Sequence, residues 1–289
     1  MHSISAFEPV AIFCLFNVIF AAGLYVTVLS GQLSMATAAI AGVGGYVGAI
    51  LTTNINWPLP AAILASVVAC GVLGGLIGLI TMRMRDFILK LTTLAIGEML
   101  AVTAFNIDYI GGANGFSGIP LLTTLTVTAI SAACALFIAW GFDHSRLGLA
   151  ARATRDDDLA ANSMGVNTRK VRLVTFIIGS ALIGWGGVLQ AHYVSMVSPH
   201  DMGFFPSLMI VIFLLFGGMY SLWGPVLAAI LLTMLPELLR FTNEYRMIFY
   251  GLLITIVILR FPEGILRRRG ARLPAGRLNR TEVRRHHEA

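Results

Sequence analysis

Charged residues are scarce in this chain: they make up only 12% of its 289 residues, against 57% apolar residues. With a mean hydropathy of +0.83, this composition excludes a water-soluble surface and indicates a protein embedded in lipid. Cysteine is also rare. Cys14, Cys70 and Cys134 each lie inside an apolar run without C-x-x-C spacing, so we expect small buried thiols and neither a metal site nor a disulfide.

A phosphate-binding loop is absent as well. The sequence contains no G-x-x-x-x-G-K-[ST] motif, and its two lysines, Lys90 and Lys170, lie outside glycine-rich segments. No apolar run carries H-E-x-x-H, paired aspartates or a Ser/His/Asp set at matching depth. We therefore expect no enzyme activity, no catalytic residue, no bound metal and no cofactor in this chain.

The apolar residues are gathered in runs of about 20, the length that a helix needs to cross a hydrocarbon core of about 30 Å. Five runs have few or no charges: 10–29, 33–53, 61–82, 121–142 and 173–194. Four further runs are less regular: 87–107, 204–220, 222–239 and 245–261. Because lipid offers the backbone no hydrogen-bond partner, each run is predicted to be a helix.

The predicted fold class is therefore all-α, a polytopic membrane helix bundle of about eight to ten transmembrane helices, with nine as the central count. Gly217, Gly218, Gly224 and Pro225 interrupt the long apolar stretch at 204–240. This leaves open a re-entrant hairpin there in place of a full crossing.

The basic residues predict the orientation of the helices. All but Arg240 and Arg246 fall in three polar stretches, 83–90, 146–172 and 260–285, which the positive-inside rule assigns to the cytoplasm. Lys and Arg are missing from the loops 54–60, 108–120 and 195–205. With nine crossings the amino terminus lies outside and the carboxyl terminus inside, and Arg240 and Arg246 are exceptions on the outer side.

The net charge of +6 and the isoelectric point near 9.6 do not indicate nucleic-acid binding, because the basic residues flank the predicted spans. Anionic lipid headgroups are the expected counter-charge. We divide the chain into a membrane domain, 1–266, with a polar cytoplasmic loop at 143–172, and a basic cytoplasmic tail, 267–289, which is predicted to be disordered near lipid.

Small residues recur at helix-packing intervals within the spans. Gly44 and Gly48 form one G-x-x-x-G pair, and Gly74 and Gly78 form another. These pairs predict close helix contacts. An alternative is that some glycines allow helices to slide or break around a central path.

The polar loop at 143–172 contains a segment, Thr154 to Gly165, with the pattern of one short helix. A Thr or Asp is available as the N-cap, acidic residues follow in the first turn, and Gly165 stands at the end. Leu159, Ala160 and Met164 would form a small apolar face. This segment is either a solvated linker or a helix that docks onto a cytosolic partner.

Five motifs, in order along residues 30–266, are similar to those of permease subunits from branched-chain amino acid ABC importers of the Liv type. They are 29–34 (LSGQLS), 111–120 (GGANGFSGIP), 152–167 (RATRDDDLAANSMGVN), 216–225 (FGGMYSLWGP) and 260–264 (RFPEG). The chain departs from the family pattern at two places. Met35 to Thr37 stand where relatives commonly have Gly-His, and Tyr220 stands where Gly is usual. These departures bear on the identity of the substrate more than on membership of the family.

The resemblance implies a transmembrane subunit that provides the translocation path for branched-chain or related amino acids in a bacterial inner membrane. Its implied partners are a second permease subunit, two cytosolic ATPase subunits that bind the ATP, and an extracytoplasmic substrate-binding protein. The family's coupling helix maps onto Arg155, Asp156, Asp157, Asp158, Leu159, Ala160, Ala161, Met164, Gly165, Val166 and Asn167.

Polar residues within or beside the spans are candidates for the substrate path, because burying them in lipid is costly. Glu98 is the strongest, since a carboxylate near mid-bilayer costs about 2.5 to 3.5 kcal/mol on insertion scales. The weaker candidates are Gln32, Ser34, Asn114 and Gln190. Hydrogen bonding to a neighbouring helix is the alternative for each of them, and His192 fits an ordinary interfacial residue better than a proton relay.

Two function classes remain. In the first, the chain is an importer permease driven by a separate ATPase. In the second, it is a secondary transporter or channel for small polar solutes, and Glu98 and His192 carry protons. The docking-helix pattern favours the importer, while the sequence leaves the transported amino acid or amide and the identity of the second permease open.

Overall fold

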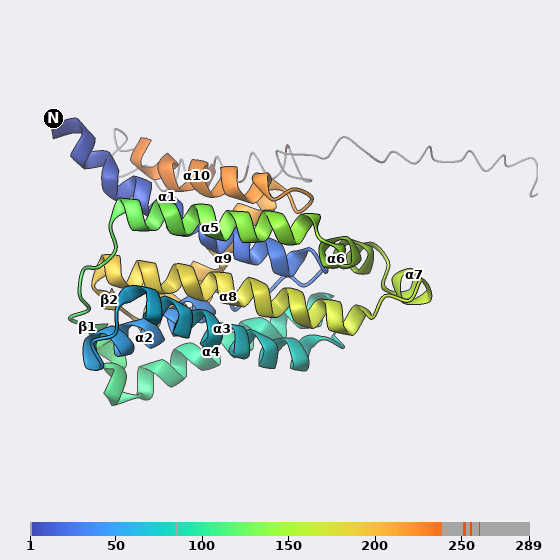
Figure 1. The fold of residues 1–289 in the computed structure, drawn as a ribbon, viewed down its shortest axis with the longest axis horizontal. Helices are drawn as coiled ribbons and strands as arrows, with labels where there is room; N and C mark the ends of the chain where they lie inside the picture. Colours follow the sequence, from blue (N-terminus) through green and yellow to red (C-terminus); the bar gives the residue numbers. More distant parts are fainter. Residues whose placement is uncertain (1, 85, 239–250, 253–254, 256–259, 261–289) are drawn as a thin grey trace, which may run out of the picture.

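The chain folds into a bundle of helices in the computed structural model, which describes residues 2–84, 86–238, 251–252, 255 and 260 (Figure 1). The long helices run side by side along one axis of the molecule (Figure 1). In chain order, the elements are α1 (His2–Val28), α2 (Thr37–Asn54), α3 (Leu59–Thr81), α4 (Asp86–Asn106), η1 (Asp108–Ile110), η2 (Gly112–Asn114), β1 (Phe116–Ser117), α5 (Leu125–His144), α6 (Arg146–Asp156), α7 (Asp158–Ser163), α8 (Thr168–Val194), β2 (Met196–Val197), η3 (Pro199–Met202), α9 (Phe204–Gly217) and α10 (Trp223–Leu238).

Five helices of the described part, α1, α3, α4, α5 and α8, are long and apolar enough to cross a membrane. They coincide with five of the nine predicted spans. Of the other predicted spans, α2 has 18 residues, α9 has 14 and α10 has 16. The ninth predicted span, 245–261, lies almost wholly outside the described residues, as do Arg240, Arg246 and the tail at 267–289.

The loops sort to the two ends of the bundle as the basic residues predict. At one end, Arg172 Nη1 donates to the carbonyl of Met82, 3.4 Å away, which joins the start of α8 to the end of α3. At the other end, Asn54 Nδ2 donates to the Tyr109 hydroxyl at 3.0 Å, and β1 pairs antiparallel with β2. We call the first the basic end and the second the opposite end; α6 and α7 lie at the basic end (Figure 1).

Helix α8 lies in the middle of the bundle and packs against α1, α2 and α3. The predicted glycine pairs face it: Gly44 lies against Gly184, and Gly74 lies against Ser180. A side chain at either position would collide with the neighbouring helix, so the prediction of close helix contacts is confirmed.

Helices α9 and α10 form an antiparallel pair that runs between the two ends. Before α9, the chain passes through β2, which pairs with β1 at the opposite end. The turn after α9 contacts Arg155 of α6 at the basic end. The segment 204–238 is thus two helices connected at the basic end, although α9, at about 21 Å, is shorter than a hydrocarbon core.

One expectation about the cysteines is wrong. Cys14 and Cys70 are buried, but the Cys134 side chain is exposed on α5. A cysteine has low polarity, so an apolar helix can expose it to lipid as easily as bury it. Its position within an apolar run therefore does not predict whether Cys134 is buried.

Candidate coupling and substrate sites

The predicted short helix is present as α7, with Asp and not Thr as its N-cap, but the segment from Thr154 to Gly165 is divided between two helices. Thr154 belongs to α6, which ends at Asp156. Asp157 then adopts an extended conformation, and its carboxylate accepts hydrogen bonds from the backbone N–H of Leu159 and Ala160 at 2.9 and 3.0 Å. An aspartate that caps a new helix cannot continue the previous one, which explains the break.

The end of α7 is as predicted. Gly165 follows the last turn with a φ of +84°, a left-handed conformation that favours glycine. Val166 N–H donates to the Ala161 carbonyl at 3.1 Å and closes the turn. We call α6, α7 and this turn, residues 146–166, the docking hairpin.

An apolar groove of about 560 Å³ lies between the two helices of the docking hairpin. Its lining includes Leu149, Ala153, Ala160 and Met164, together with the charged residues Arg146, Asp156 and Asp157. Met164 is 86% exposed and the neighbouring Leu159 is 79% exposed. Leu147 and Leu149 of α6 are exposed as well, and a cluster of large exposed apolar side chains is typical of a surface that another protein covers.

Ion pairs fix the docking hairpin to the bundle. Arg152 Nη1 lies 2.7 Å from the carboxylate of Asp143 at the end of α5. Arg172 of α8 lies 3.7 Å from the Asp158 carboxylate at the start of α7. These two pairs connect the docking hairpin to α5 and α8.

Arg155 joins the docking hairpin to two connections of the bundle. Its Nη1 donates to the Met219 carbonyl at 3.2 Å, and its guanidinium lies 4.8 Å from the centre of the Tyr220 ring, both in the turn between α9 and α10. Its backbone and side chain also lie against Gly31, whose φ is +83°, in the connection between α1 and α2. A single residue thus contacts two connections of the bundle that are far apart in sequence.

Gln32 and Ser34, two of the predicted path residues, are 1% and 2% exposed in the connection between α1 and α2. Ser30 donates to the Gln32 side-chain oxygen at 3.2 Å and lies 2.7 Å from the Thr175 hydroxyl of α8. Ser34 accepts from the Ala36 N–H at 3.2 Å. The two residues belong to a packed polar network near the basic end, and their role in transport stays a prediction.

Glu98 is exposed on α4, on a face where Met99 and Val102 are 57% and 59% exposed. Its carboxylate lies close to Gly203, the residue that leads into α9. The structure thus places a carboxylate on an apolar outward surface, where lipid alone would be an unfavourable neighbour.

The remaining predicted path residues lie elsewhere. Asn114 is exposed in η2 at the opposite end, while Gln190 of α8 lines a cavity on another side of the molecule. The structure therefore does not bring Gln32, Ser34, Glu98, Asn114 and Gln190 together in one site. His192 is buried, with its ring nitrogens 2.9 Å from the Thr52 hydroxyl and 2.8 Å from the Val188 carbonyl, as expected for a residue with a structural role.

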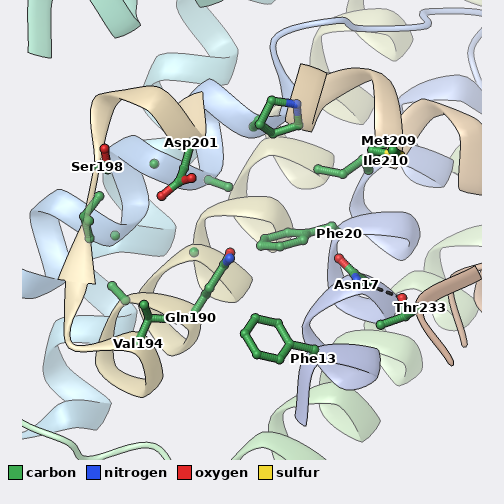
Figure 2. A pocket seen from close by; sticks show the side chains of 18 of the residues that line it. Phe13, Asn17, Phe20, Gln190, Val194, Ser198, Asp201, Met209, Ile210 and Thr233 are labelled. Carbon is green, nitrogen blue, oxygen red and sulfur yellow. Dashed lines mark hydrogen bonds between the residues drawn. The ribbon is translucent and has the colours of Figure 1, made fainter. Parts of the chain in front are cut away.

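The cavity beside Gln190 has a volume of about 560 Å³ and lies between α1, α2, α8, η3, α9 and α10. Its lining includes Phe13, Phe20, Gln190, Ser198, Asp201 and Met209. We call it the Asp201 cavity. Figure 2 shows the Asp201 carboxylate and the Gln190 amide directed into one space beside the Phe20 ring.

Sequence reasoning missed Asp201, Ser198 and Asn17 as members of this cavity. Asp201 lies in η3, within a loop that carries no span signal, and only the fold brings it against α1 and α8. Partial burial raises the pKa of the Asp201 carboxyl above its usual range, and the neighbouring His200 opposes this shift. The only sequence signal for this site was an acidic residue, Asp201, in a predicted loop that otherwise contains no Lys, Arg or Glu.

The structure defines the class of the protein as a multi-pass membrane helix bundle, with the docking hairpin at one end and a cavity of small-molecule size toward the other. Sequence comparison specifies the class further. Residues 8–258 match the family described as "Branched-chain amino acid transport system / permease component", and the chain belongs to this family.

Individual relatives agree with the family assignment. The chain is 29% identical to the high-affinity branched-chain amino acid transport system permease protein LivM of Escherichia coli K12, over 89% of this chain and 69% of LivM. It is 31% identical to LivH of Salmonella typhimurium over 43% of this chain and 41% of LivH. A probable LivM of Methanocaldococcus jannaschii is 26% identical over 71% of this chain and 67% of its own length. No solved structure matches.

Proposed function

We propose that the chain is the membrane-spanning subunit of an ATP-driven importer in a bacterial inner membrane, and that it provides part of the translocation path for branched-chain or related amino acids. In this proposal it pairs with a second permease subunit, as the separate names LivM and LivH among its relatives suggest. Two cytosolic ATPase subunits bind the ATP, and a substrate-binding protein delivers the amino acid from outside.

The observation that carries this proposal is the docking hairpin. Its apolar groove and the exposed side chains of Leu159 and Met164 offer a surface to a cytosolic protein. Covering each of these side chains would contribute about 1.5 to 3 kcal/mol. The chain has no phosphate-binding motif of its own, so the energy source would be the covering protein.

The contacts of the docking hairpin suggest how nucleotide-driven movement reaches the helices. Movement of α7 would act on α8 through the pair of Asp158 with Arg172. Movement of α6 would act through Arg155 on the turn at Met219 and on the connection at Gly31. Both routes end on helices that line the Asp201 cavity, which suits a rigid-body switch between outward-open and inward-open states.

The other partners would bind elsewhere on the molecule. The substrate-binding protein would approach the opposite end, where the glycine-rich segment 111–120 is held by the pairing of β1 with β2. The second permease would cover the face of α4 that exposes Glu98, and the carboxylate would then border the path between two subunits. A substrate ammonium is one partner that such a carboxylate accepts.

Reconstitution tests the proposal. This chain, its permease partner, the ATPase and the binding protein are assembled in proteoliposomes, and uptake of labelled leucine is measured with and without ATP. We expect uptake that requires ATP and the binding protein and that survives collapse of the proton gradient. Uptake by this chain alone, driven by a proton gradient, would replace the importer with a secondary transporter.

A further inference from the structure

The Asp201 cavity has two chemically different sides. One side carries the carboxylate of Asp201, the amide of Gln190 and the hydroxyl of Ser198. The other side carries mainly aromatic and aliphatic groups, among them Phe20 and Met209, and its polar residues Asn17 and Thr233 are hydrogen-bonded to each other at 2.9 Å (Figure 2). A volume of about 560 Å³ falls in the range of about 300 to 1,000 Å³ that is typical of small-molecule sites.

Small residues keep this space open. The lining includes Ala38, Ala41, Gly42, Gly45 and Gly187, which come from α2 and α8. Close contact between the two helices requires small residues at some of these positions, since Gly187 lies directly against Ala41. With the aromatic rings of α1 on the far side, the result is a recess with one negatively charged side chain in its described lining and an apolar wall.

We propose that the Asp201 cavity binds the transported amino acid inside this one subunit, with Asp201 pairing with the substrate ammonium and Phe20 and Met209 packing on its aliphatic side chain. This inference rests on the proposed function, because it names the substrate class and its place on the path. It differs from the expectation for Glu98, which lies on the outward face of α4 and not in this cavity.

The position of the Asp201 cavity suits an intermediate binding site on the transport path, between delivery of the amino acid at the opposite end and its release at the basic end. Its Ser198 and Asp201 lie in the segment that follows β2, and β2 pairs with the glycine-rich loop at the opposite end. Its apolar lining comes from α1, α9 and α10, whose connections at the basic end contact Arg155. A ligand here would therefore be held by the same helices that the docking hairpin moves.

The experiment measures ligand binding directly, without the binding protein. The full-length chain is placed in nanodiscs of phosphatidylethanolamine and phosphatidylglycerol, and saturation-transfer NMR follows L-leucine as the probe. 3-Methylbutylamine and 2-hydroxy-4-methylpentanoate are used as competitors, because the first keeps the amine and the second replaces it by a hydroxyl. We expect the amine to displace leucine and the hydroxy acid to be at least tenfold weaker.

Four variants separate charge recognition from folding. Asp201→Asn should weaken leucine binding at least tenfold and abolish the preference for the amine, whereas Asp201→Glu should retain that preference. Glu8→Gln makes the same charge change at an exposed position of α1 outside the cavity lining and should leave binding unchanged. Phe20→Leu should weaken leucine more than it weakens alanine, because it trims the apolar wall.

Two results would overturn the inference: equal binding by wild type and Asp201→Asn, or displacement of the probe by added phospholipid and not by the amine, which would indicate an acyl-chain site. Failure of the proposed function gives a different pattern. In that case the complete set of four proteins shows no ATP-dependent uptake, whatever the binding data show. ATP-dependent uptake that persists while Asp201→Asn changes neither binding nor transport would leave the importer intact and remove only the Asp201 cavity from its path.

Discussion

The two ends of the bundle differ in how they are held together. At the basic end, ion pairs join neighbouring elements, Arg152 with Asp143 and Arg172 with Asp158, and a charged hydrogen bond joins Arg155 to the distant turn at Met219. At the opposite end, a neutral hydrogen bond between Asn54 and Tyr109 and the short β1–β2 pair connect the segments. Charged contacts break and re-form at modest cost near water, so the basic end is suited to movement and the opposite end to a stable entrance.

The largest expected effect comes from reversing the charge of the docking hairpin. Replacing Asp156, Asp157 and Asp158 by lysine removes the cap of α7 and the pair with Arg172, and it should reduce ATP-driven leucine uptake to background. Gly165→Pro should do the same, because proline cannot adopt a φ of +84°. Membrane insertion, followed by fractionation and protease protection, should stay normal. Undiminished uptake would show that the docking hairpin has no part in coupling.

Arg155→Gln tests whether one residue connects the docking hairpin to the bundle. The variant loses the charge-assisted bond to the Met219 carbonyl and the contact with the Tyr220 ring. We expect ATP hydrolysis to continue while uptake per ATP falls about tenfold, which corresponds to about 1.4 kcal/mol of lost coupling. Uptake and hydrolysis that fall together would indicate loss of ATPase docking instead.

Glu98→Gln tests the outward face of α4. If the carboxylate borders the path, the variant should raise the leucine concentration for half-maximal uptake about three- to tenfold and leave ATPase docking unchanged. Glu98→Asp, which keeps the charge, should be closer to wild type. Wild-type transport curves for both variants would leave Glu98 with a packing role against the second permease.

The smallest effect is expected at Tyr220. Its ring lies beside the Arg155 guanidinium, a contact worth about 0.5 to 1 kcal/mol at an exposed site. Tyr220→Ala should therefore lower uptake about two- to fivefold, while Tyr220→Phe keeps the ring and should match wild type. Equal loss in both variants would assign the effect to the hydroxyl and contradict the ring contact.

Hydropathy and basic residues predicted the architecture well, because both are local properties of the chain. The five long spans and the sorting of loops to two ends follow from the cost of placing polar groups in lipid. The break at Asp157 was missed because cap and first-turn acidic residues look alike in sequence. The capping geometry distinguishes them, and only the structure shows which carboxylate bonds to Leu159 and Ala160.

The candidate sites were less predictable, because they depend on contacts between segments far apart in sequence. Gln190 was selected for its polarity, but its neighbour Asp201 was not, since η3 reads as an ordinary loop. The departure at Tyr220 was visible in the sequence, whereas its contact with Arg155, 65 positions earlier, was not. The burial of Gln32 and Ser34 likewise depends on Thr175 of α8.

Helix α8 makes contact with both functional regions. Arg172 near its start pairs with α7, and Gln190 near its end lines the Asp201 cavity. The two residues are 18 steps apart along one continuous helix, a distance of about 27 Å. A tilt of α8 that begins at Arg172 would therefore also move Gln190 and change the shape of the Asp201 cavity.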